Sequence, residues 1–188
     1  ANESPYPPSP GVAAALNAQE AANLRLYGDA TAGALKAALA KQYGVEPENV
    51  FVANGSDEAL NFAFLAYATD GRGVAFADLT YSFYPVFCDL YHIQANVIPL
   101  KEDFSLSPQD YYGLNQTIVI ANPNAPSGLA LGREEIEGIV KANQNSVVVI
   151  DEAYVDFGAE SCVELTRKYQ NLLVVQTYSK SRSMAGAR

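Results

Sequence analysis

The stretch VVVIDEAY, residues 147–154, decides the fold of this 188-residue chain. It opens with four β-branched apolar residues in a row and then delivers a carboxylate, Asp151. Apolar residues that do not alternate with polar ones are typical of a strand buried on both faces of a parallel sheet. Further runs of this kind, rich in Val, Ile and Phe, predict strands at residues 50–53, 73–77, 96–99, 117–121, 147–150 and 172–176.

Segments of helical length separate these strands. An Ala-rich pattern over residues 31–43 places Leu35 and Leu39 four residues apart and ends at Gly44, as an amphipathic helix with a glycine stop does. Further helices are predicted at residues 56–68, 82–91, 133–142 and 162–169. Strands that alternate with helices predict an α/β fold, a three-layer α/β/α arrangement with a mostly parallel central sheet.

The composition excludes several classes of protein. The formal net charge is −9 and no segment concentrates Lys and Arg, so nucleic acid is not an expected partner. No apolar run approaches the roughly 20 residues that span a bilayer, and residues 1–10 lack the features of a signal peptide. Because Cys88 and Cys162 lie in apolar contexts without a CxxC spacing, we expect buried thiols and a cytoplasmic location. The only histidine, His92, cannot form a zinc cluster, and no metal site is predicted.

Polar residues follow most of the predicted strands. Ligands of open parallel sheets bind outside the carboxyl ends of the strands, so these residues are the first candidates for function. They form five short segments, at residues 54–58, 78–81, 122–128, 151–154 and 177–180.

The segment Gly55-Ser56-Asp57-Glu58 lies where a strand is expected to turn into a helix. Free backbone N–H groups and the positive end of the helix dipole can receive a phosphate there, and Gly55 permits close approach. The alternative is that Ser56 or Asp57 only caps the helix.

Three charged side chains extend this pattern. Asp151, at the end of a buried strand, needs a cationic partner, and a protonated pyridine nitrogen is one; an Arg partner or a loop cap is the alternative. Lys180 follows the last strand, where an enclosed amine becomes a nucleophile toward an aldehyde; a solvated surface lysine is the alternative. Arg188 offers a planar fork to a phosphate, with Ser179 as a hydroxyl donor. The four features occur in chain order at successive strand ends, which favours one shared site.

The motifs resemble those of fold-type I, pyridoxal-phosphate-dependent aminotransferases, and within them the histidinol-phosphate aminotransferase branch. YSKSRSMAGAR, residues 178–188, is similar to the segment that holds the cofactor, with eight residues from the lysine to the arginine. NESPY, residues 2–6, resembles the Asn-Glu-Asn-Pro-Tyr signature of that branch, and RLYGD, residues 25–29, resembles its Arg-Tyr-Pro-Asp region. The resemblance spans essentially the whole chain.

The resemblance implies a role for each matching residue. Lys180 would hold pyridoxal 5'-phosphate as a Schiff base, Asp151 would pair with the pyridine nitrogen, Tyr154 would bond the ring hydroxyl and Tyr81 would stack on the ring. Lys180, Asp151 and Tyr81 are the expected catalytic residues. Ser56, Asp57, Ser179 and Arg188 would hold the cofactor phosphate, Tyr27 would reach the phosphate of a second subunit, and Tyr6 would lie near the substrate. A homodimer is therefore expected.

Two departures from the family pattern are present. The family places Asn just before the Pro of its Asn-Pro-Thr-Gly motif, to bond the ring hydroxyl, where this chain has Ala125, and Asn124 or Asn122 is expected to compensate. The chain also stops at Arg188, before the family's C-terminal small domain. Residues 1–30 are then an N-terminal segment for substrate and dimer contacts, and residues 31–188 an incomplete cofactor-binding large domain.

The implied reaction transfers an amino group from histidinol phosphate to 2-oxoglutarate, giving imidazole acetol phosphate and glutamate in histidine biosynthesis. Two alternatives remain open. The first is a related pyridoxal-phosphate-dependent threonine-phosphate decarboxylase of cobalamin synthesis. The second is a catalytically inert domain that retains the fold.

Overall fold

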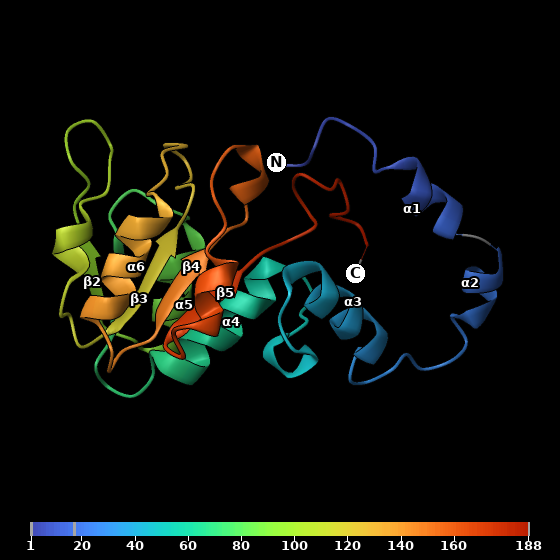
Figure 1. Ribbon diagram of the computed structural model, residues 1–188, viewed down its shortest axis with the longest axis horizontal. Helices are drawn as coiled ribbons and strands as arrows, with labels where there is room; N and C mark the ends of the chain where they lie inside the picture. Colours follow the sequence, from blue (N-terminus) through green and yellow to red (C-terminus); the bar gives the residue numbers. More distant parts are fainter. Residues whose placement is uncertain (1, 17, 188) are drawn as a thin grey trace. The chain divides into compact units, whose positions relative to one another are not determined.

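The computed structural model describes residues 2–16 and 18–187. The chain divides into two compact units. One consists of Ala1–Gly55 together with Tyr178–Arg188, and the other of Ser56–Thr177. The second unit contains the sheet (Figure 1).

The sheet has five strands in the order β2-β1-β3-β4-β5, and every neighbouring pair is parallel. Its central strands β1, β3 and β4 are buried along their whole length, whereas the edge strand β2 is partly exposed. This confirms the parallel sheet predicted from the unalternated runs. The strands are β1 (Val74–Ala77), β2 (Ala95–Ile98), β3 (Thr117–Ala121), β4 (Val148–Asp151) and β5 (Leu172–Val175).

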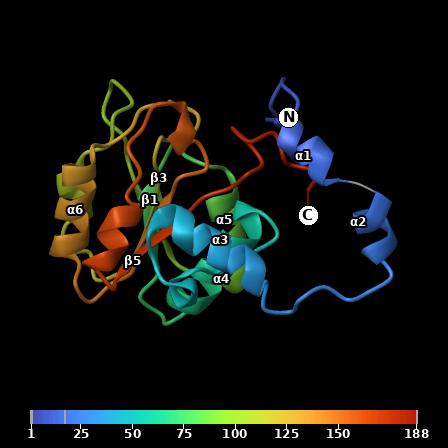
Figure 2. The same cartoon turned by 45° about the vertical axis from the view of Figure 1, so that its right-hand side comes forward.

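Helices cover both faces of the sheet, which confirms the three layers (Figure 2). On one face, α4 (Ser56–Tyr67) and α5 (Phe83–Tyr91) pack their apolar side chains against β1, β3 and β4. On the other, α6 (Arg133–Ala142) packs with the 3₁₀ helices η2 (Pro108–Tyr111) and η4 (Val163–Arg167). A further 3₁₀ helix, η3, covers Val155–Phe157. The helix predicted at residues 162–169 is therefore only a 3₁₀ segment.

Local sequence explains the start and the packing of α6. The carboxylate of Glu135 accepts a hydrogen bond from the backbone N–H of Gly132 at 2.8 Å, which satisfies one of the free donors at the helix start. Ile136, Ile139 and Val140 recur at the spacing of one helix face, and all three are buried. The helix is thus fixed at its start and along its apolar stripe.

The first unit is mainly helical. It contains α1 (Pro10–Ala15), α2 (Ala18–Asn23), α3 (Gly33–Tyr43) and the 3₁₀ helix η1 (Pro47–Asn49). The side chain of Asp29 accepts a hydrogen bond from the N–H of Gly33 at 2.7 Å, and Gly44 ends α3 with φ 64°. This confirms the predicted helix with its glycine stop.

The strand predicted at residues 50–53 is wrong. This segment is not part of any strand in the described chain, although Val50 has an extended backbone. Phe51 exposes 66% of its surface, so the run is not buried on both faces as a central strand requires. Apolar content alone does not distinguish a strand from an extended connection.

Both thiols are buried and free, as predicted. Burial raises the pKa of Cys88 to about 11 and that of Cys162 to about 12, so both stay protonated at neutral pH. No helix within residues 2–16 and 18–187 combines the length and apolarity needed to cross a bilayer.

Gly73, directly before β1, allows the close packing between β1 and the segment before β2 to be tested by substitution. It has φ 84°, and an added Cβ would collide with the backbone carbonyl oxygen of Gln94, which accepts the N–H of Val74 at 3.0 Å. We expect Gly73→Ala to lower the free energy of unfolding by about 3 kcal/mol, from backbone strain and the clash together. Gly71→Ala is the control, because Gly71 has φ 88° with open space around it. Equal losses in chemical denaturation would show that the clash is absent.

Candidate active site

The candidate site lies in the second unit, at the carboxyl ends of β1, β3 and β4. From β1 the chain continues to β2 on one side of the sheet, and from β3 it continues to β4 and β5 on the other side. Open parallel sheets bind their ligands at such a reversal of strand order. The ends of these strands, the loops that follow them and the first turn of α4 carry six predicted site residues of this unit. They are Ser56, Asp57, Tyr81, Asn124, Asp151 and Tyr154.

Asp151 is the last residue of β4 and exposes only 5% of its surface. One carboxylate oxygen, Oδ2, accepts a hydrogen bond from the hydroxyl of Tyr84 at 2.9 Å, and Oδ1 accepts the N–H of Ala153 at 3.1 Å. Burial raises the pKa of Asp151 to about 6, although both hydrogen bonds act in the opposite direction. The carboxylate is therefore held in place, and it takes up a proton at a pH closer to neutral than an ordinary aspartate does.

Asp151 has no cationic partner in the described chain. Ion pairs of the described residues include those of Asp70, Glu137, Glu160 and Glu164, and none of these pairs uses Asp151. A buried carboxylate is costly unless a cation compensates it. The position thus fits a cationic ring nitrogen, the partner that the sequence predicts for Asp151.

Tyr81 and Asp57 are joined directly. The hydroxyl of Tyr81 donates to Oδ1 of Asp57 at 2.8 Å, which links the loop after β1 to the first turn of α4. Burial, and then this bond, raise the pKa of Tyr81, and the nearby groups of Asp151 and Tyr154 raise it further. The structure therefore brings these four predicted residues together around one partly buried phenol.

Ser56 and Asp57 are the first two residues of α4, a helix of 12 residues. They lie within the first helical turn, where backbone N–H groups have no intrahelical acceptor. Ser56 is half-buried and Asp57 is exposed. This geometry is compatible with the predicted phosphate cradle, while the carboxylate of Asp57 already holds Tyr81.

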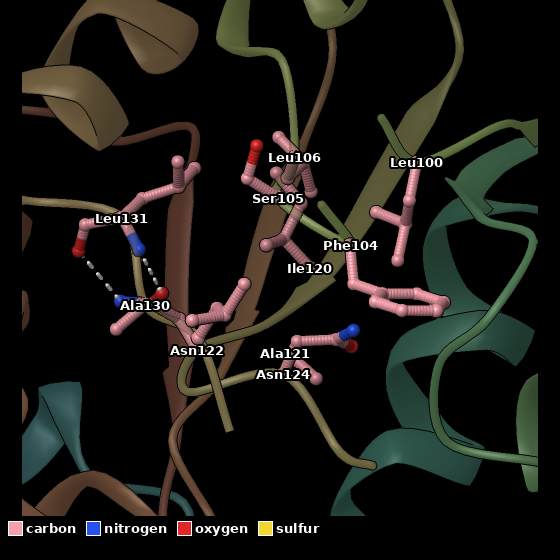
Figure 3. A pocket seen from close by; sticks show the side chains of 11 residues that line it. Leu100, Phe104, Ser105, Leu106, Ile120, Ala121, Asn122, Asn124, Ala130 and Leu131 are labelled. Atoms are coloured by element: carbon pink, nitrogen blue, oxygen red, sulfur yellow. Dashed lines mark hydrogen bonds between the residues drawn. The ribbon is translucent and has the colours of Figure 1, made fainter. Parts of the chain in front are cut away.

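The side chains of Asn122 and Asn124, in the Asn-Pro-Asn loop, both form hydrogen bonds with other groups of the protein. The side chain of Asn122 accepts the N–H of Leu131 at 2.7 Å and donates to its carbonyl oxygen at 3.2 Å (Figure 3). The side chain of Asn124 accepts the hydroxyl of Thr80 at 2.8 Å and donates to the carbonyl oxygen of Leu79 at 2.9 Å. Both amides are thus engaged in fixing the loop, and their predicted role in place of the residue at Ala125 stays a prediction.

A small pocket lies beside this loop (Figure 3). Its lining is mostly apolar, and includes Leu106, Ile120 and Leu131. These three side chains belong to the core on the α6 face of the sheet, whereas Tyr81 and Tyr84 belong to the core on the opposite face. The pocket therefore lies mainly on the α6 face, although Asn124 of the candidate site also lines it.

The other predicted residues belong to the first unit. Tyr6 and Tyr27 are highly exposed, and Ser179 and Lys180 are half-buried. The segment around Lys180 is folded into turns, in which the N–H of Ser183 donates to the carbonyl oxygen of Lys180 at 3.1 Å. Arg188 lies outside the described residues.

Sequence reasoning missed the role of Tyr84. It is not among the residues predicted for the site, yet it is fully buried and its hydroxyl is the side-chain partner of Asp151. A Tyr at a buried helix position could have indicated this role, because a buried phenol needs a hydrogen-bond partner.

Glu152 was also missed. It is almost fully buried, and its carboxylate accepts hydrogen bonds from the hydroxyl of Ser161 and the amide of Gln176, both at 2.7 Å, and from the N–H of Cys162 at 2.5 Å. These contacts join the end of β4 to the loop before η4 and to the residue after β5. Glu152 thus stabilises the end of β4, where Asp151 lies.

We expect Glu152→Ala to lower the free energy of unfolding by about 2–3 kcal/mol, because three donors lose their acceptor in the interior. Glu102→Ala, at an exposed position, is expected to change it by less than about 0.5 kcal/mol. Urea denaturation of both variants measures the difference. A loss of the same small size in both would show that Glu152 does not stabilise the strand end.

The family model described as aminotransferase class I and II matches residues 1–188. The histidinol-phosphate aminotransferase of Marinomonas sp. is 54% identical over 188 residues, 100% of this chain and 53% of that protein. That of Hydrogenovibrio crunogenus is 53% identical over 187 residues, 100% of this chain and 52% of that protein. The chain thus spans about half the length of these curated relatives.

A solved structure has the same fold. The histidinol-phosphate aminotransferase from Sinorhizobium meliloti, in complex with pyridoxal-5'-phosphate, aligns with a TM-score of 0.89 at 26% identity, over 100% of this chain and 53% of that one. Since the family model covers every residue and the fold agrees, the chain belongs to the aminotransferase class I and II family.

Proposed function

We propose that this chain carries the cofactor-binding part of a pyridoxal-phosphate-dependent aminotransferase. The observation that supports this best is the buried carboxylate of Asp151, which has no cationic partner in the described chain and lies at the strand ends beside Tyr81. The proposed reaction converts histidinol phosphate and 2-oxoglutarate to imidazole acetol phosphate and glutamate. The identity of 54% to a histidinol-phosphate aminotransferase supports this substrate.

Each predicted residue has a task in this proposal. When bound, pyridoxal phosphate supplies a ring that takes up the electron pair released at the substrate's α-carbon. Asp151 would keep the ring nitrogen protonated, Tyr154 would bond the ring hydroxyl, and Tyr81 would stack on the ring while its own hydroxyl donates to Asp57. Asn124 would contribute from the loop after β3. Ser56, Asp57, Ser179 and Arg188 would hold the phosphate.

Lys180 acts as attachment point and base. Its amine would hold the cofactor covalently and, once the amino donor has taken its place, would serve as the base for the α-proton of the donor. The same amine would return a proton for release of the keto product, and the conversion of 2-oxoglutarate to glutamate would use the same residues.

A second copy of the chain completes the site in this proposal. Tyr27 is fully exposed, and the same N-terminal segment also exposes Leu24 and Leu26. An exposed aromatic and apolar segment supports burial against a partner, where Tyr27 would reach the cofactor phosphate. Tyr6 would lie near the substrate, residues 1–30 would form the contact segment, and the enzyme would act as a cytoplasmic homodimer.

Decarboxylation is the second candidate. The L-threonine-O-3-phosphate decarboxylase from Porphyromonas gingivalis aligns with a TM-score of 0.76 at 27% identity, over 90% of this chain and 54% of that one. The two reactions share the cofactor and differ in the bond that breaks at the α-carbon.

Product analysis of the full-length protein with pyridoxal phosphate separates these functions. Glutamate that forms only with both histidinol phosphate and 2-oxoglutarate supports the proposal. Carbon dioxide released from threonine phosphate without a keto acid would assign the decarboxylase instead. No change in cofactor absorbance on mixing would indicate an inert domain that retains the fold.

A further inference from the structure

Tyr84 connects the hydrophobic core to the candidate site. It lies in the first turn of α5, is fully buried, and its hydroxyl donates to Oδ2 of Asp151 at 2.9 Å. The two residues are 67 positions apart in the sequence, so the contact depends on the folded core. It is the only side-chain hydrogen bond to Asp151 within residues 2–16 and 18–187.

The ring of Tyr84 is fixed by aromatic neighbours on three elements. Its centroid lies 5.9 Å from that of Phe64 on α4, 5.8 Å from that of Phe76 on β1, and 5.6 Å from that of Tyr81. Side chains in a close-packed core have little freedom to move. The hydroxyl is therefore held against the carboxylate by packing as well as by the hydrogen bond.

The hydrogen bond from Tyr84 opposes the effects that raise the pKa of Asp151. Burial and the negative charges of Asp57 and Glu152 favour the protonated carboxyl, whereas the hydroxyl of Tyr84 and the N–H of Ala153 favour the ionised one. Tyr81 also lies near Asp151, and it donates its own hydroxyl to Asp57. Tyr84 thus supplies the side-chain donor that keeps Asp151 charged.

We propose that Tyr84 is a positioning residue that keeps Asp151 ionised and oriented toward the ring nitrogen of the cofactor. The inference rests on the proposed function. A proton between the carboxylate and the ring nitrogen stays on the nitrogen only while the carboxylate is the weaker base. A hydrogen bond donated to the carboxylate makes it a weaker base, so Tyr84 favours the charged pair.

The test compares Tyr84→Phe with Tyr91→Phe in the full-length protein. Tyr91 lies at the other end of α5, and its hydroxyl donates to Asn61 at 2.7 Å, away from Asp151. Each variant loses one hydroxyl from the same helix. The readouts are the dissociation constant of pyridoxal phosphate and the NMR shift of its isotope-labelled ring nitrogen as a function of pH.

For Tyr84→Phe we expect about tenfold weaker cofactor binding, because a hydrogen bond to a charged group is lost, and a ring-nitrogen shift at neutral pH that moves toward the value of the unprotonated ring, because the carboxylate becomes a stronger base and takes up more of the shared proton. Tyr91→Phe is expected to match the unmodified protein in both. If both variants shift equally, or neither shifts, the inference is wrong while the proposed function stands. If the unmodified protein binds no cofactor, the proposed function fails first.

A second substitution covers the case in which Tyr84→Phe does not fold. Replacing Tyr84 by 3-fluorotyrosine keeps the shape and makes the hydroxyl a stronger donor. The ring-nitrogen shift at neutral pH should then move toward the value of the fully protonated ring, and an unchanged shift would overturn the inference.

Discussion

Replacing Lys180 by Ala is expected to lower the rate of transamination by about 10⁴-fold, since one amine serves as both attachment point and general base in the proposed mechanism. Cofactor binding should persist in part, because Asp151 and the phosphate contacts do not depend on this amine. A steady-state assay with histidinol phosphate and 2-oxoglutarate measures the rate, and the absorbance of the protein-bound cofactor reports its attachment.

Lys168→Ala is the matched control for this variant. Its exposed amine lies 3.9 Å from the partly buried carboxylate of Glu137, and a surface pair at this distance contributes little to stability. The rate of this variant should equal that of the unmodified protein. Full activity of Lys180→Ala would remove Lys180 from the mechanism, and an equal loss in both variants would point to a general effect of removing a positive charge.

Asp151→Asn is expected to have two opposite effects. It should reduce cofactor-dependent activity by about 10²- to 10³-fold, because the cationic ring nitrogen loses its charged partner in a buried site. It should also stabilise the cofactor-free protein above pH 6, because the buried charge is gone. The amide can still accept the N–H of Ala153 and donate to the hydroxyl of Tyr84.

The pH dependence of this stabilisation follows from the pKa of Asp151. That pKa is about 6 in the folded protein against 3.8 for an ordinary Asp, so the folded state binds the proton more tightly and the charged form destabilises it. The gain from Asp151→Asn should be absent below about pH 4, grow between about pH 4 and 6, and reach about 3 kcal/mol above that range.

Thermal unfolding of the cofactor-free protein at pH 4 and pH 7 measures this gain. Asp110→Asn, at an exposed position, should show no such dependence on pH. A destabilised Asp151→Asn variant at pH 7 would mean that a cation within the protein already compensates the carboxylate. The fit of the site to a cationic ring would then lose its main support.

Much of the fold could be predicted because burial on both faces of a sheet requires unalternated apolar runs. The runs at 117–121 and 147–150 became β3 and β4, the two central strands with the longest buried contact. The positions of Asp57, Tyr81 and Asp151 near one another follow from the same pattern, since the carboxyl ends of parallel strands share one edge.

Tertiary context decided the rest. The run at 50–53 is as apolar as a strand, but the sheet is complete without it within the described residues. The partner of Tyr84 lies 67 positions away in the sequence, and the partners of Glu152 lie 9, 10 and 24 positions away. No local sequence pattern specifies such contacts. Residue type alone could suggest only that a buried phenol or carboxylate needs a partner.

The covalent attachment of the cofactor at Lys180 is the most direct test of the account. The full-length protein is incubated with pyridoxal phosphate, reduced with borohydride, digested, and its peptides are mapped by mass. A single label on Lys180 is the predicted result. Label spread over several surface lysines, or none at all, would mean that the chain retains the fold without its chemistry.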